Sequence, residues 1–247
     1  MNRHPTLPPA AASDLLTESV QRIGISIIIP VLNEAGRIED AIAKAWQASA
    51  DEVIVSDGGS TDQTVAVAEK SNCTVVKTIP GRGQQLNAGA AQASGDILLF
   101  LHADNWLNAG AAEQIREAMQ DSECLGGGFK QRINSNTFAF RLVEHGNYFR
   151  AKRQRLVYGD QGLFIRRTVF ESLGGFPDTP LMEDFVFSQK LFQGNRKPVM
   201  LPGPLHVDPR RWKKSGVLRQ TIKNWKTAIA FRLGASPESL YQRYYQD

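Results

Sequence analysis

Cysteine is scarce in this sequence, and long apolar runs are absent. The 247 residues include two cysteines, Cys73 and Cys124, and neither lies in a pattern with zinc-ligand spacing. This argues against a disulfide scaffold and a structural zinc site. The longest apolar runs, Ile25–Val31 and Ile97–Leu101, are far shorter than the ~18 residues of a membrane span. Since the N-terminus also lacks an apolar stretch typical of a signal peptide, we expect a cytoplasmic protein in a reducing setting.

Acidic residues are missing from one part of the chain. The net charge is +4, but His206–Asp247 holds nine Lys or Arg and three Asp or Glu, so this segment carries +6 and the rest −2. Pro209–Arg232 contains eight basic residues and no acidic one. This imbalance predicts an anionic ligand or surface near the segment, with a solvated helix face as the alternative.

The first half of the sequence alternates short apolar runs with amphipathic patterns. Residues 1–22 contain three prolines and no sustained apolar period, which predicts a flexible tail. Apolar residues beginning at Ile38 follow the spacing of a helix that lies on a sheet. Strands alternating with such helices indicate an α/β fold, with a mostly parallel, Rossmann-like sheet and helices on both faces. The predicted strands are Ile25–Ile29, Val53–Ser56, Thr74–Lys77 and Ile97–Leu101.

The second half is less regular, and no linker separates it from the first. We therefore expect a single continuous domain. A basic amphipathic helix is predicted over Ser215–Leu233. Its apolar stripe fits a helix packed on the core, the interpretation we favour, and also a helix lying on anionic lipid. The other predicted elements are Gly126–Arg132, Leu163–Arg166 and Val199–Leu201 as strands and Phe138–Arg155 and Glu183–Gln193 as helices.

Polar residues follow the first two strands, where α/β proteins bind ligands beyond the carboxyl ends of the strands. Glu34 lies in the segment Pro30–Glu34, and its carboxylate suits hydrogen bonds from a base or ribose; it also suits the first turn of a helix. Asp57 precedes two glycines and offers an acceptor for a base N–H group. The same glycines suit a tight turn.

Charged residues follow the next strands. Arg82 lies between glycines and suits a planar or anionic partner such as a diphosphate. Asp104 closes the segment His102–Asp104, where one carboxylate together with substrate phosphates can hold Mg²⁺ or Mn²⁺. Glu183 and Asp184 open a predicted helix; both suit a helix N-terminus, and either can act as a general base.

Seven segments occur in the order typical of one enzyme family. The sequence resembles glycosyltransferase family 2, which has the GT-A fold, over about residues 24–233. Within the family it looks most like a small bacterial subgroup found beside radical SAM proteins, for which a context in arsenosugar biosynthesis has been proposed. The segments are PVLNE, SDGGSTD, GRGQQLNAG, LLFLHAD, GDQG, MEDFVF and RRW; the subgroup's late elements resemble Asp208–Trp212 and Gly234–Glu238.

The resemblance implies a metal-assisted, inverting glycosyltransferase that takes a nucleotide-diphosphate sugar. It implies a nucleotide-binding half over about residues 23–107, an acceptor half over 108–205 and basic C-terminal helices over 206–247. Asp184 matches the family's catalytic base, and Asp104 matches the metal-binding aspartate of its DxD motif. Pro30, Glu34, Asp57, Arg82, Asp104, Arg211 and Trp212 are the residues implied to bind the nucleotide sugar.

Two positions depart from the family pattern. His102 replaces the first aspartate of the DxD motif, and the Arg-Trp motif lacks its leading glutamine. A nucleotidyltransferase, which can use a similar sheet, is one alternative. A non-catalytic module that lies on the inner face of the membrane through the basic C-terminal helix is another. Nucleic-acid binding is not expected, because the basic segment has no helix-turn-helix or zinc pattern. The acceptor is unknown.

Overall fold

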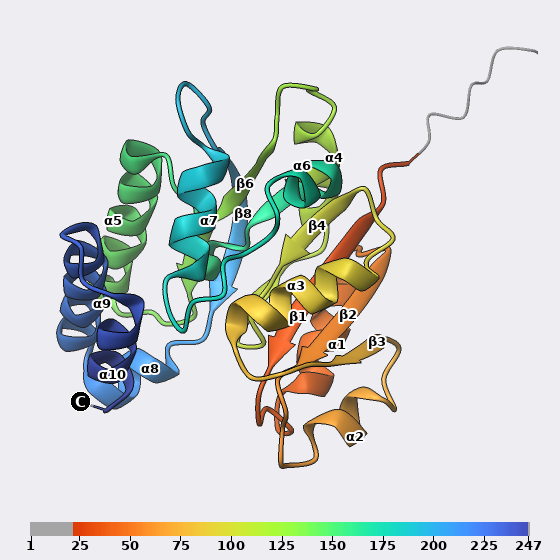
Figure 1. The fold of residues 1–247 in the computed structure, drawn as a ribbon, viewed down its shortest axis with the longest axis horizontal. Helices are drawn as coiled ribbons and strands as arrows, with labels where there is room; N and C mark the ends of the chain where they lie inside the picture. Colours follow the sequence, from red (N-terminus) through yellow and green to blue (C-terminus); the bar gives the residue numbers. More distant parts are fainter. Residues whose placement is uncertain (1–21, 247) are drawn as a thin grey trace, which may run out of the picture.

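The computed structural model describes residues 22–246, so the tail predicted over residues 1–22 lies outside the described part except for Arg22. Figure 1 shows a twisted sheet flanked by helices, with three C-terminal helices gathered beside α5. The elements in chain order are β1 (Ile25–Val31), α1 (Ile38–Gln47), β2 (Glu52–Asp57), α2 (Thr64–Ala68), β3 (Thr74–Lys77), α3 (Arg82–Gln92), β4 (Ile97–Phe100), β5 (Asn105–Leu107), α4 (Ala111–Ala118), β6 (Gly126–Ile133), α5 (Phe138–Gln154), η1 (Gly159–Gln161), β7 (Phe164–Arg166), α6 (Arg167–Ser172), α7 (Glu183–Leu191), β8 (Val199–Val207), α8 (Arg210–Ser215), α9 (Val217–Arg232) and α10 (Pro237–Gln246).

The sheet has eight strands in the order β3-β2-β1-β4-β7-β6-β8-β5. Strands β1 to β4 pair in parallel, as the sequence predicts. Strand β7 then lies antiparallel to β4, although the strands come from opposite halves of the chain. The loops after β1, β2, β3 and β4 therefore meet at one edge, and β7 carries the sheet on into the second half.

Alternate residues of β1 explain why helices cover both faces of the sheet. Ile27 and Ile29 point to one face and pack in a cluster with Ile38 of α1 and residues of α4. Ile28 points to the other face, in a cluster that includes Leu86 of α3 and Phe187 of α7. Because strand side chains alternate with a period of two, β1, which is apolar apart from Ser26, needs a cover on each side.

Two differences from the predicted elements have identifiable physical causes. Strand β8 runs on to Val207, beyond the predicted end at Leu201. The prediction ended too early because Pro202 and Pro204 interrupt the apolar run by which a strand is recognised in the sequence. The short strand β5 was not predicted; it is held by antiparallel pairing with the last residues of β8. The division of the domain at residues 107 and 205 stays a prediction.

The C-terminal helices correct one interpretation. The predicted basic helix over Ser215–Leu233 is confirmed as α9 (Val217–Arg232), and a separate short helix, α8, precedes it and ends before Gly216. Core packing of the α9 stripe is wrong for Ile222, Trp225 and Ile229, which are 40%, 46% and 55% exposed, and for Leu233, just beyond the helix. The side chain of Leu218 lies outside the described residues. Within residues 22–246, no helix is both long and apolar enough to cross a membrane.

Close packing around β6 gives a test of this fold. A Cβ atom added at Gly127 would lie 1.9 Å from the Val199 carbonyl oxygen of the adjacent strand. We expect Gly127→Ala to lower the free energy of unfolding by about 1–3 kcal/mol, because β6 and β8 must move apart. Thermal or denaturant unfolding measures this. Gly36→Ala is the matched control, since an added Cβ there meets nothing within 4 Å; equal stability of the two variants would contradict the strand packing described.

Candidate functional site

Two cavities open at the sheet edge where the strand-following loops meet. The sheet-edge cavity, of about 540 Å³, is lined by Pro30, Glu34 and the α3 N-terminus. The helix-lined cavity, of about 170 Å³, lies toward α9 and α10. Arg82, His102 and Asp104 line both. The loops after β1, β3 and β4 thus form one continuous rim, as their place in a parallel sheet predicts.

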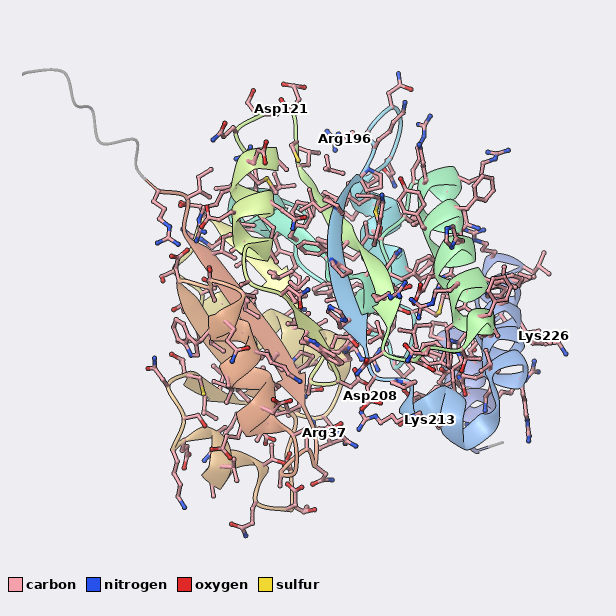
Figure 2. All side chains as sticks on the ribbon, turned by 180° about the vertical axis from the view of Figure 1, so that it is seen from behind. Arg37, Asp121, Arg196, Asp208, Lys213 and Lys226 are labelled. Carbon is pink, nitrogen blue, oxygen red and sulfur yellow. The ribbon has the colours of Figure 1, made fainter. Side chains whose placement is uncertain are left out.

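Arg210, at the start of α8, joins two carboxylates across this rim. Its Nη2 atom lies 3.1 Å from Asp104 Oδ2 and 3.3 Å from Glu34 Oε1. Burial favours the neutral guanidine, but the hydrogen bond to Glu34 and attraction to Asp104 outweigh burial, so the pKa of Arg210 is raised. Glu34 also pairs with Arg37 at 3.0 Å. The two guanidinium groups thus offset the neighbouring carboxylates of Glu34 and Asp104. Figure 2 shows Arg37 and Asp208 at this end of the sheet.

A second arginine compensates a buried acid. Arg82 Nη1 lies 3.3 Å from Glu183 Oε1, and Glu183 is 1% exposed. Burial, the largest influence, raises the pKa of Glu183; Arg82 opposes the shift and Asp184 adds to it. The net effect of the neighbouring acids raises the pKa of Arg82 despite its burial. Arg82 is the first residue of α3, so the helix fixes its backbone, and the ion pair with Glu183 positions its guanidinium.

Asp184 is held by backbone N–H groups from two elements. Gly159 donates to its Oδ2 at 2.5 Å, and Phe185 donates to its Oδ1 at 2.7 Å. A Cβ atom at Gly159 would lie 3.0 Å from His102 Nε2 and 3.1 Å from Asp184 Oδ2. Glycine therefore lets the η1 segment approach both side chains. Asp184 lines the helix-lined cavity together with Asp104, but does not line the sheet-edge cavity.

Asp57 lies deeper than its predicted role suggests. It is 3% exposed and lines neither of these cavities. Its Oδ2 accepts hydrogen bonds from the N–H groups of Gly59 and Ser60, both at 3.0 Å, so the carboxylate shapes its own loop. Its Oδ1 is buried and makes no hydrogen bond with the described residues. A contact from Asp57 to a base stays a prediction.

The Arg-Trp motif is described only in part. Trp212 lines the helix-lined cavity, is 7% exposed, and meets the ring of Phe140 edge-on at 5.9 Å. Its Nε1 is buried without a hydrogen-bond partner among the described residues. Arg211 lies in α8, but its side chain is outside the described part. Pro30, the next-to-last residue of β1, lines the sheet-edge cavity as predicted.

The far wall of the helix-lined cavity was not predicted. Gln220, Asn224 and Thr227 of α9 line it with Tyr244 of α10. Gln220 Nε2 donates to Asn224 Oδ1 at 2.9 Å, and Tyr244 Oη donates to the same oxygen at 2.9 Å. The three α9 residues recur every three or four positions, which marks a polar stripe. The sequence alone does not show that this stripe faces a cavity.

A divalent cation has few protein ligands here. Among residues 22–246, no cluster of three or more His, Cys, Asp or Glu side chains could hold a metal ion. Asp104 at the shared rim supplies one carboxylate, with His102 lining the same cavities. Mg²⁺ and Mn²⁺ are commonly held by one or two carboxylates and completed by substrate phosphates. The residues fit an ion shared with a diphosphate and do not fit an all-protein metal centre.

Comparison with known proteins decides the family. Residues 26–173, more than half of the chain, match the sequence profile of Glycosyl transferase family 2. The chain belongs to glycosyl transferase family 2. Glucosyl-3-phosphoglycerate synthase from Mycobacterium tuberculosis is 38% identical over 92 residues, covering 32% of this chain and 28% of that protein. Probable glycosyltransferase YdaM from Bacillus subtilis is 23% identical over 218 residues, covering 76% of this chain and 52% of that protein. The matches thus span between about a quarter and half of these relatives.

Solved structures confirm the GT-A type fold of this family 2 member. Residues 1–349 of TarS from S. aureus, in complex with UDP-GlcNAc, align with a TM-score of 0.59 at 18% identity, covering 75% of this chain and 58% of that one. The mannosyltransferase PcManGT from Pyrobaculum calidifontis, in complex with GDP-Man and Mn²⁺, aligns with a TM-score of 0.59 at 21% identity, covering 92% and 70%. At these identities the likeness concerns the fold alone.

The buried pair Arg82–Glu183 gives a test of the rim. We expect Arg82→Met to lower the free energy of unfolding by about 1–3 kcal/mol, because Glu183 loses its counter-charge. A carboxyl whose folded pKa is raised loses stability as pH rises through its ionisation, so the deficit should be larger near pH 8 than near pH 5. Urea unfolding at the two pH values measures this.

The double variant Arg82→Met with Glu183→Gln is the control for that experiment. It removes the unpaired charge and should recover most of the stability and flatten the pH dependence. A deficit that is the same in single and double variants at both pH values would show that Glu183 does not depend on Arg82.

Proposed function

We propose that the protein is an inverting glycosyltransferase that moves a sugar from a nucleotide-diphosphate sugar to an acceptor hydroxyl. The observation that carries this proposal is the rim shared by the two cavities. Arg82 and Asp104 line both cavities, whereas Asp184 lines only the helix-lined one. A donor diphosphate at the shared rim would thus have cationic and carboxylate groups beside it and a base on the side from which an acceptor enters.

The sheet-edge cavity is proposed to hold the nucleotide part of the donor. Its volume of about 540 Å³ is within the range of small-molecule sites. Pro30 and Glu34 would lie against the nucleoside, while Arg82 and Arg210 supply positive charge toward the diphosphate. Asp57, through the buried Oδ1, is the proposed acceptor for a base N–H. Arg211 and Trp212 stay proposed donor-binding residues near the diphosphate.

Asp104 is the residue proposed to hold Mg²⁺ or Mn²⁺, together with phosphate oxygens of the donor. When bound, such an ion neutralises charge on the departing diphosphate. Arg210 lies 3.1 Å from Asp104 and adds positive charge at the same point. Of the solved structures named above, that of PcManGT contains Mn²⁺ with its donor, which supports a divalent ion without fixing which one.

Asp184 is proposed to remove the proton from the acceptor hydroxyl. The oxygen of that hydroxyl then forms a bond to the anomeric carbon while the bond from that carbon to the diphosphate oxygen breaks. A single in-line displacement inverts the configuration. The hydrogen bonds from Gly159 and Phe185 hold the carboxylate in place for this step. The acceptor itself is proposed to enter the helix-lined cavity, where amide and hydroxyl groups of α9 and α10 suit a polar molecule.

A nucleotidyltransferase is the second candidate. Asp184 lines the helix-lined cavity and not the sheet-edge cavity. This favours sugar transfer, because a hydroxyl acceptor needs a base on its own side of the rim. Analysis of the products separates the two reactions. Incubation with nucleotide sugars should release a nucleoside diphosphate, whereas release of pyrophosphate from a nucleoside triphosphate would overturn sugar transfer. A non-catalytic surface module would release neither.

The setting of the enzyme is part of the proposal. The cysteines Cys73 and Cys124 are both free, which suits a reducing, cytoplasmic location. We also propose that the basic C-terminal helix contacts the inner face of the membrane. We do not propose a nucleic-acid partner. Membership of the subgroup found beside radical SAM proteins rests on the late segments Asp208–Trp212 and Gly234–Glu238, and is likewise proposed.

Substitution of Asp184 tests the base. We expect Asp184→Asn to lower turnover by at least about a hundredfold while nucleotide binding is kept, because general-base catalysis contributes ~10²–10⁴-fold. The rate of nucleoside diphosphate release measures this. Asp160→Asn, which removes another carboxylate from the helix-lined cavity, is the control and should lose far less. Retained activity in Asp184→Asn would remove Asp184 from the role of base.

Substitution of Asp104 tests the metal site. In the native protein, Mn²⁺ should increase the rise in unfolding temperature produced by a nucleoside diphosphate. We expect Asp104→Ala to lose this dependence on Mn²⁺. Asp178→Ala removes an exposed carboxylate from the sheet-edge cavity and should keep it. Nucleotide binding that is independent of Mn²⁺ in the native protein would contradict the assignment.

A further inference from the structure

Large apolar side chains are exposed mainly on one pair of helices. Of the eleven large apolar or aromatic residues exposed in the described part of the chain, seven lie on or directly after α5 and α9. Isolated apolar residues are normal on a protein surface, but a contiguous group marks an interaction site. We call this group the α5–α9 face. Its members are Phe138, Leu142, Phe149, Ile222, Trp225, Ile229 and Leu233.

The apolar stripes of the two helices meet. On α9 the exposed residues recur every three or four positions, as one helical stripe does. On α5, Leu142 and Phe149 lie one turn before and one turn after Gly146. A Cβ atom at Gly146 would lie 3.7 Å from the ring of Trp225, so the ring covers this point of α5. Figure 1 shows α5 and α9 as neighbours. The stripes therefore form one patch, centred near Trp225.

A groove with only positive charge borders the patch. It lies between α9 and α10 and has a volume of about 390 Å³. Ile222, a member of the α5–α9 face, lines it as well. Within residues 22–246, no carboxylate lies in ion-pair distance of its four cations, and α9 contains no acidic residue. The four cations are Arg219, Lys223, Lys226 and Arg243.

We infer that the α5–α9 face and the basic groove together bind the surface of an anionic lipid bilayer. Exposed Trp, Phe, Leu and Ile side chains beside Lys and Arg are the composition of helices that lie in a membrane interface. The apolar patch would enter the acyl boundary, and the four cations would contact the phosphates of anionic headgroups. The inference deepens the membrane contact proposed above, and its test does not depend on sugar transfer.

The position of α9 gives this contact a consequence for the site. Its exposed stripe lies opposite Gln220, Asn224 and Thr227, which line the helix-lined cavity. The same helix would thus face lipid on one side and the proposed acceptor cavity on the other. Binding to a bilayer would place that cavity within one helix diameter, about 10 Å, of the headgroup layer.

Sedimentation with vesicles tests the inference. The full chain should pellet with vesicles of phosphatidylcholine that contain phosphatidylglycerol, and much less with pure phosphatidylcholine. Two double variants, Trp225→Ser with Ile229→Ser and Arg219→Glu with Lys226→Glu, should each weaken binding by about tenfold or more. The first variant changes two apolar residues and the second changes two basic residues. All four side chains are exposed, so the fold is expected to tolerate the changes.

Matched controls lie elsewhere on the surface. Ile79→Ser removes an apolar side chain that is 63% exposed but lies outside the α5–α9 face. Arg196→Glu with Lys197→Glu reverses two exposed charges, and Figure 2 shows Arg196 far from Lys226. Both should bind anionic vesicles like the native chain. The inference is overturned if the native chain does not pellet, if it pellets equally with both lipids, or if the patch instead forms a dimer that the Trp225 variant dissolves.

Discussion

The charge balance at the sheet edge depends on Arg210. Glu34 follows the first strand and Asp104 follows the fourth, and the parallel order of the sheet brings the two carboxylates together. Like charges at short range repel strongly when water is partly excluded. One guanidinium between them converts this repulsion into attraction. Because Arg210 comes from α8, it also ties the C-terminal part of the chain to the loop after β1.

Arg82 has the corresponding role on the other side of the rim. It compensates Glu183, which is almost fully buried, and leaves the neighbouring Asp184 to be held by backbone N–H groups. Two acids adjacent in sequence thus have different surroundings. Glu183 belongs to the packed interior, whereas Asp184 lines a cavity. This difference, and not the acidic pair as such, is what makes Asp184 the better candidate for a base.

The sequence predicted the part of the fold that depends on local patterns. The four parallel strands and the loops after them follow from apolar runs such as Ile25–Ile29, which need burial on both faces. The same logic brought Glu34, Arg82 and Asp104 to one edge. The deep position of Asp57 was not foreseen, because the turn it makes with Gly59 and Ser60 draws its carboxylate inward.

The second half was harder to predict because its order comes from contacts distant in sequence. Strand β5 exists through its pairing with β8, about a hundred residues away. The stripe on α9 has the spacing of a buried helix, and only the packing of the whole chain shows that Trp225 stays exposed. In the same way, only the position of α10 and Tyr244 shows that the polar stripe of α9 lines a cavity.

The place of β7 in the sheet has a consequence for how the molecule assembles. Strand β4 is wholly buried and pairs with β1 on one side and with β7, from the second half, on the other. A fragment that ended near residue 107 would leave this apolar strand with an open edge, and such edges invite aggregation between chains. The ribosome releases β4 before β7 exists, so the newly made first half must stay protected until its distant partner strand arrives.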